Sequence, residues 1–331
     1  MPITNSQYNL LMNMYEQRRL RSRDRLNRHY ETAYEAIPEL KRIDSSISDC
    51  SVKQARKLLD GDDGALVELR EELGQLSGKR AQLLQEGGFP PDYLEPSYEC
   101  PDCQDTGYIG NQKCHCFRKA VIDLFYTQSN LAGVLEKENF DQFSFQYYSD
   151  NYIDRMTGES SLTLARRAYD ECRQFIRDFD TAHGNLLLFG TTGTGKTFLT
   201  HCIARELMQS VHSVLYLTSA EMFDALLDKA LGKSEESQVL CEQMETCDLL
   251  IIDDLGTERN TDFVISQLFV CLNERILNRK STVISTNFTL EEIRASYTER
   301  TFSRISNHFR ILRLAGDDIR IQKKLMKREA N

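Results

Sequence analysis

The sequence contains no long hydrophobic run. No stretch of about 18 or more apolar residues occurs in the 331-residue chain, so we expect no membrane-spanning helix. The N-terminal stretch up to Arg25 has neither a clean apolar core nor a small-residue cleavage site, and we expect no secretory signal peptide there. Internal repeats and low-complexity tracts are also missing. We therefore expect a globular chain rather than a membrane or repeat protein.

An excess of positive charge is missing as well. The chain has 41 Lys and Arg against 50 Asp and Glu, which gives a net charge of −9. This balance argues against a protein that grips nucleic acid by bulk electrostatics, although a local basic surface stays open because the charge is unevenly spread. The 40% apolar and 27% charged residues fit a soluble globular class. The length fits two domains with a small extra module.

The first 95 residues are predicted to form a helical region that docks a partner. Leucines recur there at roughly helical spacing between charged residues, and arginines crowd residues 18–28. The same pattern also fits a solvated helix packed on a neighbour. Glycines and prolines at 87–96 cannot continue a helix and mark a boundary. We expect three parts: residues 1–95, a small module at 96–125, and a larger domain at 126–331.

From about residue 162 the sequence alternates between helix and strand patterns. Four apolar segments predict strands, at residues 185–190, 213–219, 248–254 and 281–287. Helical patterns separate them. Thr289 and Glu292 have the spacing of a capping box, which predicts that another helix begins there. This alternation predicts an α/β fold with a mostly parallel sheet and helices on both faces.

A glycine-rich motif follows the first of these strands. Eight consecutive residues match the P-loop pattern G-x-x-x-x-G-K-[ST]: Gly190, Thr191, Thr192, Gly193, Thr194, Gly195, Lys196 and Thr197. The glycines let backbone N–H groups point at phosphate oxygens, and the following helix adds its positive N-terminal end. We expect Lys196 to contact the β- and γ-phosphates and the Thr197 hydroxyl to bind Mg²⁺. The motif predicts ATP binding.

Two carboxylates end the third predicted strand. The apolar residues 249–252 predict a buried strand, and Asp253 and Asp254 follow at its carboxyl end. Ligands bind at the carboxyl ends of strands in open α/β sheets. We expect Asp253 to hold Mg²⁺, directly or through water. Asp254 is expected to orient or deprotonate the water that attacks the γ-phosphate.

The region from about 138 to 325 resembles an AAA+ ATPase domain, specifically that of the bacterial replicative helicase loaders of the DnaC/DnaI type. The segments that carry the resemblance are NLLLFGTTGTGKTFLTHCIA, YLTSAEMFDAL, DLLIIDDLG, VISTNF, RTFSRIS and GDDIR. It implies that Asn287 is the sensor 1 residue, which lies between the γ-phosphate and the attacking water. It also implies that Arg320 is the sensor 2 residue, which contacts the γ-phosphate from the same chain. Arg304 is implied to be an arginine finger that reaches a neighbouring subunit's nucleotide. The resemblance thus implies ATP hydrolysis at subunit interfaces, and therefore self-association.

Four of the ten cysteines lie close together in the sequence. They form two close pairs, Cys100 with Cys103 and Cys114 with Cys116, a spacing suited to tetrahedral Zn²⁺. We expect structural zinc; an iron–sulfur cluster, or free or redox thiols, are the alternatives. His115 can also replace Cys114 or Cys116 as the fourth ligand. The other six cysteines are scattered, which favours a reducing, cytoplasmic setting over a secreted one.

The resemblance implies that the chain is an ATP-dependent loader of the hexameric replicative DNA helicase. The resemblance implies that the zinc-containing N-terminal region docks on the helicase and that ATP controls assembly on single-stranded DNA and helicase delivery. In the resembled family the segment near 219–247 contacts DNA; here it is weakly basic at best. The alternatives are an IstB-type transposition helper ATPase and a nucleotide-switched adaptor with negligible turnover. Aromatic residues at 140–148 can pack on the base or belong to the core.

Overall fold

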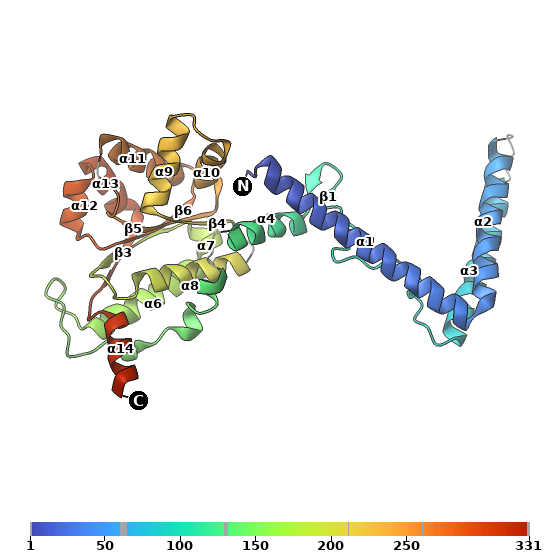
Figure 1. Ribbon diagram of the computed structural model, residues 1–331, viewed down its shortest axis with the longest axis horizontal. Coiled ribbons are helices and arrows are strands. Elements are labelled where there is room, and N and C mark those ends of the chain that lie inside the picture. Colours follow the sequence, from blue (N-terminus) through green and yellow to red (C-terminus); the bar gives the residue numbers. More distant parts are fainter. Residues whose placement is uncertain (1, 60–64, 129–131, 211, 260, 330–331) are drawn as a thin grey trace. The chain divides into compact units, whose positions relative to one another are not determined.

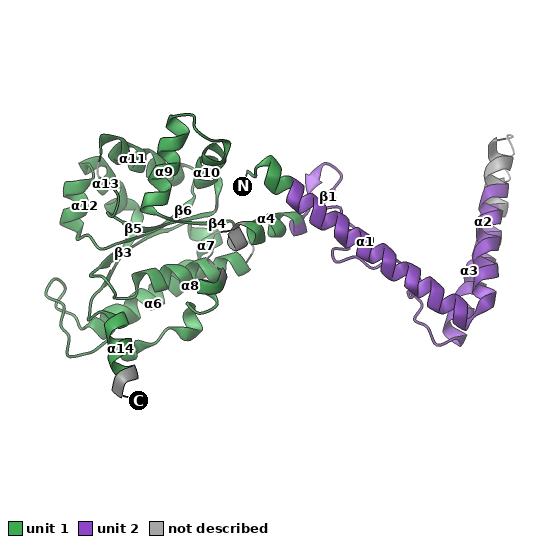
Figure 2. Ribbon diagram, viewed as in Figure 1, with its two compact units in different colours: residues 1–8, 117–331 green, residues 9–116 purple. Residues whose placement is uncertain are grey.

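The computed structural model describes residues 2–59, 65–128, 132–210, 212–259 and 261–329 (Figure 1). The chain divides into two compact units (Figure 2). One unit comprises residues 9–116, and the other comprises residues 1–8 together with 117–331. The N-terminal helices and the cysteine cluster share the first unit. The expected three-part division of the chain stays a prediction.

The unit of residues 9–116 is largely helical. Its described elements are α1 (Asn5–Ala36), α2 (Pro38–Leu59), α3 (Ala65–Glu86), β1 (Tyr108–Ile109) and β2 (Gln112–Lys113). Pro38 begins α2, the helical position at which the missing N–H of proline costs nothing. Helices α2 and α3 pack on each other as a hairpin. The predicted helical N-terminal region is confirmed.

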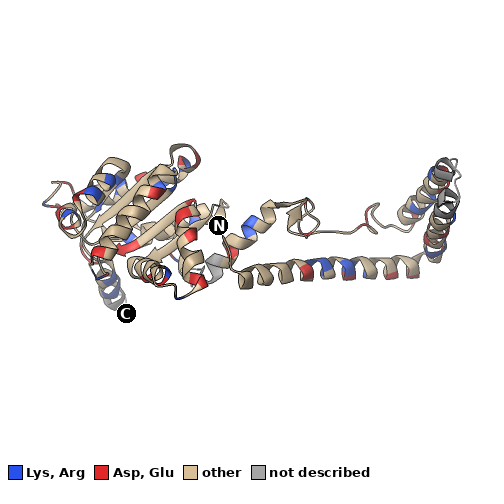
Figure 3. Cartoon of the chain, turned by 90° about the horizontal axis from the view of Figure 1, so that it is seen from above, with Lys and Arg blue, Asp and Glu red and all other residues tan. Residues whose placement is uncertain are grey.

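The proline-rich segment that follows α3 packs along α1. The Ser22 hydroxyl donates to the Ser97 carbonyl at 2.7 Å, and the His29 ring stacks on Tyr93 with centroids 4.2 Å apart. A run of basic residues marks the middle of α1 (Figure 3). The small buried core of this part consists of Ala33, Leu40, Leu84 and Leu94. The predicted boundary at 87–96 is therefore an ordered segment held against a helix.

In the described part of the second unit, a parallel sheet of five strands carries the fold. The strands are β3 (Asn185–Gly190), β4 (Val214–Thr218), β5 (Leu249–Leu255), β6 (Ser281–Thr286) and β7 (Phe309–Leu314). Their order across the sheet is β4-β5-β6-β3-β7, and every neighbouring pair is parallel. The predicted α/β fold and all four predicted strands are confirmed. The edge strand β7 was not predicted.

Helices cover both faces of this sheet (Figure 1). Before the sheet come α4 (His115–Gln128) and α5 (Ala132–Leu135), and around it lie α6 (Ser161–Arg177), α7 (Phe179–Ala182), α8 (Lys196–Gln209), α9 (Ser219–Ala230), α10 (Glu235–Thr246), α11 (Asp262–Leu277), α12 (Leu290–Ser296), α13 (Glu299–His308) and α14 (Ile319–Glu329). Short 3₁₀ turns lie at Phe140–Gln142 and Phe145–Tyr147. No helix in the described residues is both long and apolar enough to cross a membrane.

Alternate side chains along the strands pack into two separate hydrophobic cores, one on each face of the sheet. Leu186 and Leu188 of β3 pack with α6 and α8 on one face, and Leu187 packs with α9, α11 and α13 on the other. This follows from the two-residue repeat of a strand, which sends successive side chains to opposite faces. The sheet is thereby buried on both sides, which suits a continuous apolar strand such as β3.

Capping residues set where two helices begin after strands. Thr289 and Glu292 form the predicted capping box at the start of α12, and Thr218 and Glu221 form another at the start of α9. Each box satisfies backbone N–H groups that a helix start leaves without intrahelical partners. A lost cap costs about 1 kcal/mol. The caps keep the connections short, so that the helices begin near the carboxyl edge of the sheet.

Candidate nucleotide and metal sites

The P-loop joins β3 to α8 and has a backbone that needs glycine. Gly190, Gly193 and Gly195 have φ values of 143°, 79° and 94°. At Gly190 an added Cβ would lie 1.8 Å from the carbonyl oxygen of Leu314 on β7, so no side chain fits there. Helix α8 begins at Lys196, which directs its N-terminal N–H groups into the loop. The arrangement is the predicted phosphate-binding loop.

Lys196 lies at the centre of the loop. It is 4% exposed, and its Nζ donates hydrogen bonds of 2.8 Å to Gly190 O, Thr191 O and Asn287 Oδ1. Burial lowers the pKa of Lys196 to about 8, although the charges of Asp254 and Asp253 oppose the shift. Asn287 follows β6, which lies beside β3 in the sheet. The strand order therefore brings the predicted sensor 1 residue to the P-loop lysine.

The two aspartates at the end of β5 differ in their surroundings. Asp253 is 5% exposed and accepts hydrogen bonds from the hydroxyls of Thr197, at 3.3 Å, and Ser285. Asp254 has a φ of 53°, and its N–H donates to Ser285 Oγ at 3.0 Å. Burial and the charge of Asp253 raise the pKa of Asp254, while Lys196 and Arg320 oppose the shift.

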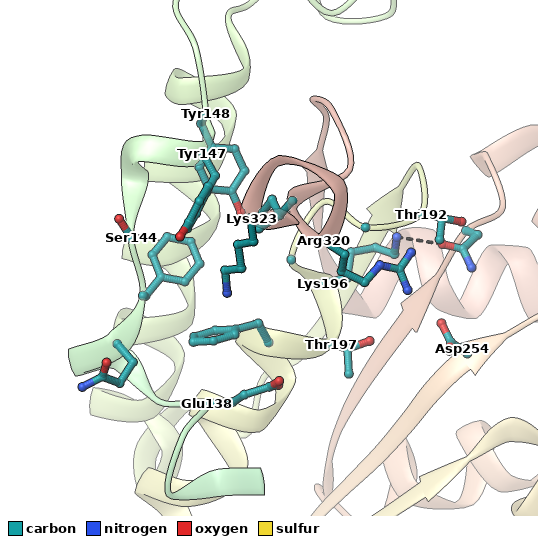
Figure 4. Close-up of a pocket in the computed structure, with 17 residues that line it drawn as sticks. Glu138, Ser144, Tyr147, Tyr148, Thr192, Lys196, Thr197, Asp254, Arg320 and Lys323 are labelled. Atoms are coloured by element: carbon teal, nitrogen blue, oxygen red, sulfur yellow. Dashed lines mark hydrogen bonds between the residues drawn. The ribbon is translucent and has the colours of Figure 1, made fainter. Parts of the chain in front are cut away.

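The residues at the P-loop and β5 fit a magnesium ion and a nucleotide. The Thr197 hydroxyl and the Asp253 carboxylate lie next to each other, and such oxygens are the ligands that Mg²⁺ prefers. Next to them opens a pocket of about 400 Å³. The sequence-predicted residues that line it are Thr192, Gly193, Gly195, Lys196, Thr197, Asp254, Asn287 and Arg320. Figure 4 shows Lys196, Thr197, Asp254 and Arg320 together on one side of this pocket.

The opposite wall of the pocket includes Ser144, Glu138 and Lys323, which were not predicted as site residues. Tyr147, Ser144 and Glu138 lie there, and Lys323 reaches in from α14 (Figure 4). Lys323 Nζ lies 5.3 Å from the centre of the Tyr147 ring, and the Glu138 carboxylate accepts a hydrogen bond of 2.6 Å from His201. Sites for small molecules combine apolar and aromatic side chains with a few polar groups that fix the orientation of the ligand.

Aromatic residues at 140–148 are divided between the core and the lining of the pocket. Phe140 and Tyr148 belong to the core packed on α6 and α8, while Phe143, Tyr147 and Tyr148 also line the pocket. The Tyr148 hydroxyl donates to the Thr194 carbonyl at 2.9 Å. The phosphate loop is thus tied to a segment that precedes the sheet by many residues.

The two predicted arginines occupy different places. Arg320 lies in the first turn of α14, lines the pocket, and pairs with Asp318 at 2.8 Å. Arg304 lies on α13, is partly exposed, and is not among the described residues that line this pocket. The structure therefore brings Arg320 to the nucleotide site of its own chain and leaves Arg304 outside it.

The cysteine cluster forms a compact group in the unit of residues 9–116. The four Sγ atoms of Cys100, Cys103, Cys114 and Cys116 lie within 4.8 Å of one another, and none of the four is in a disulfide. Tetrahedral zinc with Zn–S bonds of about 2.3 Å requires sulfurs about 3.8 Å apart. The Cys100–Cys114 and Cys103–Cys116 sulfur pairs are 3.8 Å and 3.4 Å apart. The geometry is compatible with a structural zinc site of four thiolates.

Neighbouring side chains support this cluster. The buried Asp105 carboxylate accepts the N–H groups of Glu99 and Cys100 at 2.9 Å and 2.8 Å, which fixes the first turn of the knuckle. The Tyr15 hydroxyl of α1 donates to Cys116 Sγ at 3.2 Å. His115 is 68% exposed and lies 3.4 Å from the Asp102 carboxylate. The sequence offered no signal for the role of Tyr15.

Comparisons with known proteins agree with this geometry. A family model described as IstB-like ATP binding protein matches residues 167–327. The phage-like element PBSX protein XkdC of Bacillus subtilis (strain 168) is 26% identical over 242 residues, which cover 67% of this chain and 84% of XkdC. The replicative helicase loader DnaC of Escherichia coli (strain K12) is 28% identical over 141 residues, 42% of this chain. That match spans only 56% of the length of DnaC.

A second loader matches over a longer range. The replicative helicase loader DnaI of Bacillus subtilis (strain 168) is 23% identical over 219 residues, which cover 62% of this chain and 70% of DnaI. DnaC and DnaI are thus two proteins named replicative helicase loaders to which this chain is similar.

Proposed function

We propose that this chain, whose residues 167–327 match the family described as IstB-like ATP binding protein, is an ATP-hydrolysing loader of the replicative DNA helicase. The observation that carries the proposal is the convergence of Lys196, Asp254, Asn287 and Arg320 on one pocket. These side chains come from four separate elements of the chain. Their meeting at the carboxyl edge of the sheet is what hydrolysis of a bound nucleotide requires.

Each side chain of the pocket has a distinct task in this proposal. Lys196 binds the β- and γ-phosphates, and Thr197 and Asp253 hold the magnesium ion, which when bound neutralises phosphate charge. Asp254 orients the attacking water, and its raised pKa makes it a better proton acceptor than an ordinary aspartate. Asn287 lies within 2.8 Å of Lys196 Nζ, close to where the terminal phosphate would lie.

Hydrolysis in this proposal depends on a second subunit. Arg304 lies outside the pocket of its own chain, so as a finger it serves a neighbour's nucleotide. An arginine that reaches the transferring phosphate stabilises its charge in the transition state. A lone subunit would therefore hydrolyse ATP slowly, and assembly would accelerate it.

The helicase is the proposed partner because two similar proteins are named replicative helicase loaders. The helical unit with its cysteine cluster is the proposed docking part. Contact with single-stranded DNA is proposed only for the assembled form. The α9–α10 region carries Lys229 and Lys233, but each pairs with an acidic side chain, Glu245 and Asp228 respectively. A single copy therefore offers few free cations for phosphates there.

Steady-state ATP hydrolysis tests the enzymatic part. We expect turnover by the wild type with Mg²⁺, a loss of at least about tenfold in Asp254→Asn and Arg304→Ala, and little change in Arg300→Ala on the same helix. Mixing Arg304→Ala with Lys196→Ala chains should restore part of the activity. The Lys196→Ala chain supplies the arginine finger, and the Arg304→Ala chain supplies the intact nucleotide site. Turnover by neither wild type nor mixture would leave a nucleotide-switched adaptor instead.

Complex formation tests the loading part. The full chain and the replicative helicase of the same cell should elute together from a sizing column in the presence of ATP and Mg²⁺. The match to the IstB-like family keeps a transposition helper as the second candidate. That candidate predicts binding to duplex DNA and a transposase with no helicase complex. Failure to bind the helicase in every nucleotide state would refute the loader proposal.

A further inference from the structure

Asp318, just before α14, forms an ion pair with Arg320 in the first turn of this helix. Asp318 Oδ1 accepts hydrogen bonds from the N–H of Arg320 at 2.8 Å and from its Nε at 3.1 Å. Asp318 Oδ2 accepts from Arg320 Nη2 at 2.8 Å. The Arg320 guanidinium lowers the pKa of Asp318 to about 2, so the carboxylate is charged at every physiological pH. The guanidinium therefore binds the carboxylate bidentately, through its Nε and Nη2 groups.

This carboxylate also lies directly on the phosphate loop. A Cβ added to Gly193 would be 2.2 Å from Asp318 Cγ and 2.3 Å from its Oδ1. The Ile319 N–H donates to the Gly193 carbonyl at 3.0 Å, which fixes the start of α14 on the loop. An acid so close to a phosphate-binding backbone works against an anionic ligand, because like charges repel at short range.

Helix capping explains part of this geometry but not all of it. Asp318 precedes α14 and accepts the N–H of Arg320, as an N-cap residue does. An asparagine would cap equally well, since Asn and Asp are about equally favoured at this position. Capping of the helix therefore does not require the charge of Asp318 or its bidentate contact with the Arg320 guanidinium. Asp317, the preceding residue, is exposed and makes no such pair among the described residues.

We propose that Asp318 sets the preference of the pocket between nucleoside triphosphate and diphosphate by competing with the terminal phosphate for Arg320. Both groups are anions that a guanidinium binds through paired N–H donors. A triphosphate must draw Arg320 from Asp318, whereas a diphosphate lacks the group that Arg320 would contact. The carboxylate thus weakens triphosphate binding selectively. This inference rests on the proposed function and takes Arg320, the expected sensor 2 residue, to contact the terminal phosphate.

The competition has a modest expected size. Arg320 is 66% exposed on its side chain, and Asp318 is 23% exposed, so water screens the pair. Exposed ion pairs of this kind change equilibria by a few-fold. We expect removal of the Asp318 charge to raise the preference for a triphosphate over a diphosphate by about fivefold. The change should lie mainly in triphosphate affinity.

Equilibrium binding to the full chain tests this inference. A non-hydrolysable ATP analogue and ADP, each with Mg²⁺, are titrated into the wild type, Asp318→Asn and the matched control Asp317→Asn. The Asp318→Asn chain should favour the analogue about fivefold more than the wild type does. Asp317→Asn removes the same charge next to it and should leave the ratio unchanged. In an Arg320→Ala background, Asp318→Asn should have no effect on the ratio.

Three results would overturn the inference. They are an unchanged ratio in Asp318→Asn, an equal change in Asp317→Asn, or an equal change without Arg320. Asp318→Ser, which also caps a helix, repeats the test should the Asn variant fold poorly. A wild type that binds both nucleotides while the ratio stays unchanged refutes this inference alone. A wild type that binds neither refutes the proposed function as well.

Discussion

The Ser285 hydroxyl donates a hydrogen bond to the carboxylate of Asp253, and so ties β6 to the acidic end of β5. The same oxygen accepts the N–H of Asp254 at 3.0 Å. One fully buried hydroxyl therefore holds both aspartates of the proposed magnesium and water site. Asp254 keeps its uncommon positive φ next to this contact, and Ser219 Oγ donates to its carbonyl at 3.0 Å.

Replacing Ser285 by alanine should weaken the response to magnesium. The variant removes one of the hydroxyl donors of the Asp253 carboxylate and leaves the Thr197 hydroxyl in place. Hydrogen bonds to charged groups contribute about 1.5–3 kcal/mol. We expect the rate of ATP hydrolysis to fall about tenfold and the Mg²⁺ concentration for half-maximal rate to rise. Ser281→Ala, at the other end of the same strand and also buried, is the control. Equal effects of both substitutions would point to a general loss of packing.

Replacing Gly193 by alanine should reduce nucleotide affinity. The new Cβ would meet the Asp318 carboxyl group at 2.2–2.5 Å, and the φ of 79° disfavours any side chain. We expect at least a tenfold loss in the affinity for ADP and for an ATP analogue, measured by titration. Gly232→Ala has a φ of 64° and no atom within 4 Å of the added Cβ. It should cost about 1 kcal/mol of stability and leave nucleotide affinity intact; equal losses of affinity would contradict the role of the clash.

Nucleotide affinity should fall at alkaline pH because of Lys196. Its pKa of about 8 lies below the ordinary 10.5, so the free protein loses this charge above about pH 8. Bound phosphates favour the protonated amine, and binding above that pH must take up a proton. Affinity for an ATP analogue should be flat below pH 8 and decline by up to about tenfold per pH unit above it. Lys196→Arg should show no such decline, and a parallel decline would assign the effect elsewhere.

The lowered pKa of Lys196 also makes the stability of the fold depend on pH, and stability should rise over the pH range in which nucleotide affinity falls. The unfolded chain keeps the lysine proton up to about 10.5, whereas the folded chain releases it near 8. Below pH 8 the folded chain buries a charged amine, which lowers the free energy of unfolding by the full amount. This loss of stability disappears as the pH rises from about 8 to 10.5. The free energies of unfolding of the wild type and Lys196→Met, measured with a denaturant, should converge as the pH rises from about 8 to 10.5. A difference that is constant with pH would exclude this linkage.

Zinc affinity should depend on Tyr15. Its hydroxyl donates to Cys116 Sγ at 3.2 Å, and groups that hydrogen-bond to metal ligands typically change metal affinity by about 10- to 100-fold. We expect one zinc per chain by metal analysis and an affinity about tenfold lower in Tyr15→Phe, measured by competition with a chelator. Tyr34→Phe is the control, because its hydroxyl bonds to Asp44 at 2.7 Å in the same unit. Iron in place of zinc, or equal effects of both variants, would contradict this prediction.

Local motifs made the phosphate side of the pocket predictable from sequence. The P-loop and the two aspartates are each contiguous in the chain, and apolar strands precede both. Ser285, Asp318, Glu138 and Lys323 come near them through the strand order β4-β5-β6-β3-β7 and through the packing of segments before and after the sheet. Sequence order alone does not say that β6 lies between β5 and β3. The contacts of these four side chains therefore needed the structure.

Strand β7 and helix α10 are among the elements that were not predicted, and for a related reason. Strand β7 lies at the sheet edge and carries Arg310 and Arg313, which pair with Glu171 and Asp154. Its charged residues hide the apolar signal that the central strands carry. Helix α10 is polar over most of its length and contributes Cys241 and Met244 to a core. Such elements are stabilised by tertiary packing more than by their own sequence pattern.

Strand β7 also bears on the order in which the protein can mature during synthesis. Gly190 of the phosphate loop pairs with Leu314 of β7 and tolerates no side chain against it. The loop itself is translated more than 100 residues earlier than this partner. A nascent chain that has exposed β3 and α8 outside the ribosome thus still lacks the strand that borders its first glycine. Arg320 and Lys323, which follow β7, also line the pocket, so the pocket is complete only after β7 and α14 have been translated. Nucleotide capture by a nascent chain would therefore report that these two elements are in place.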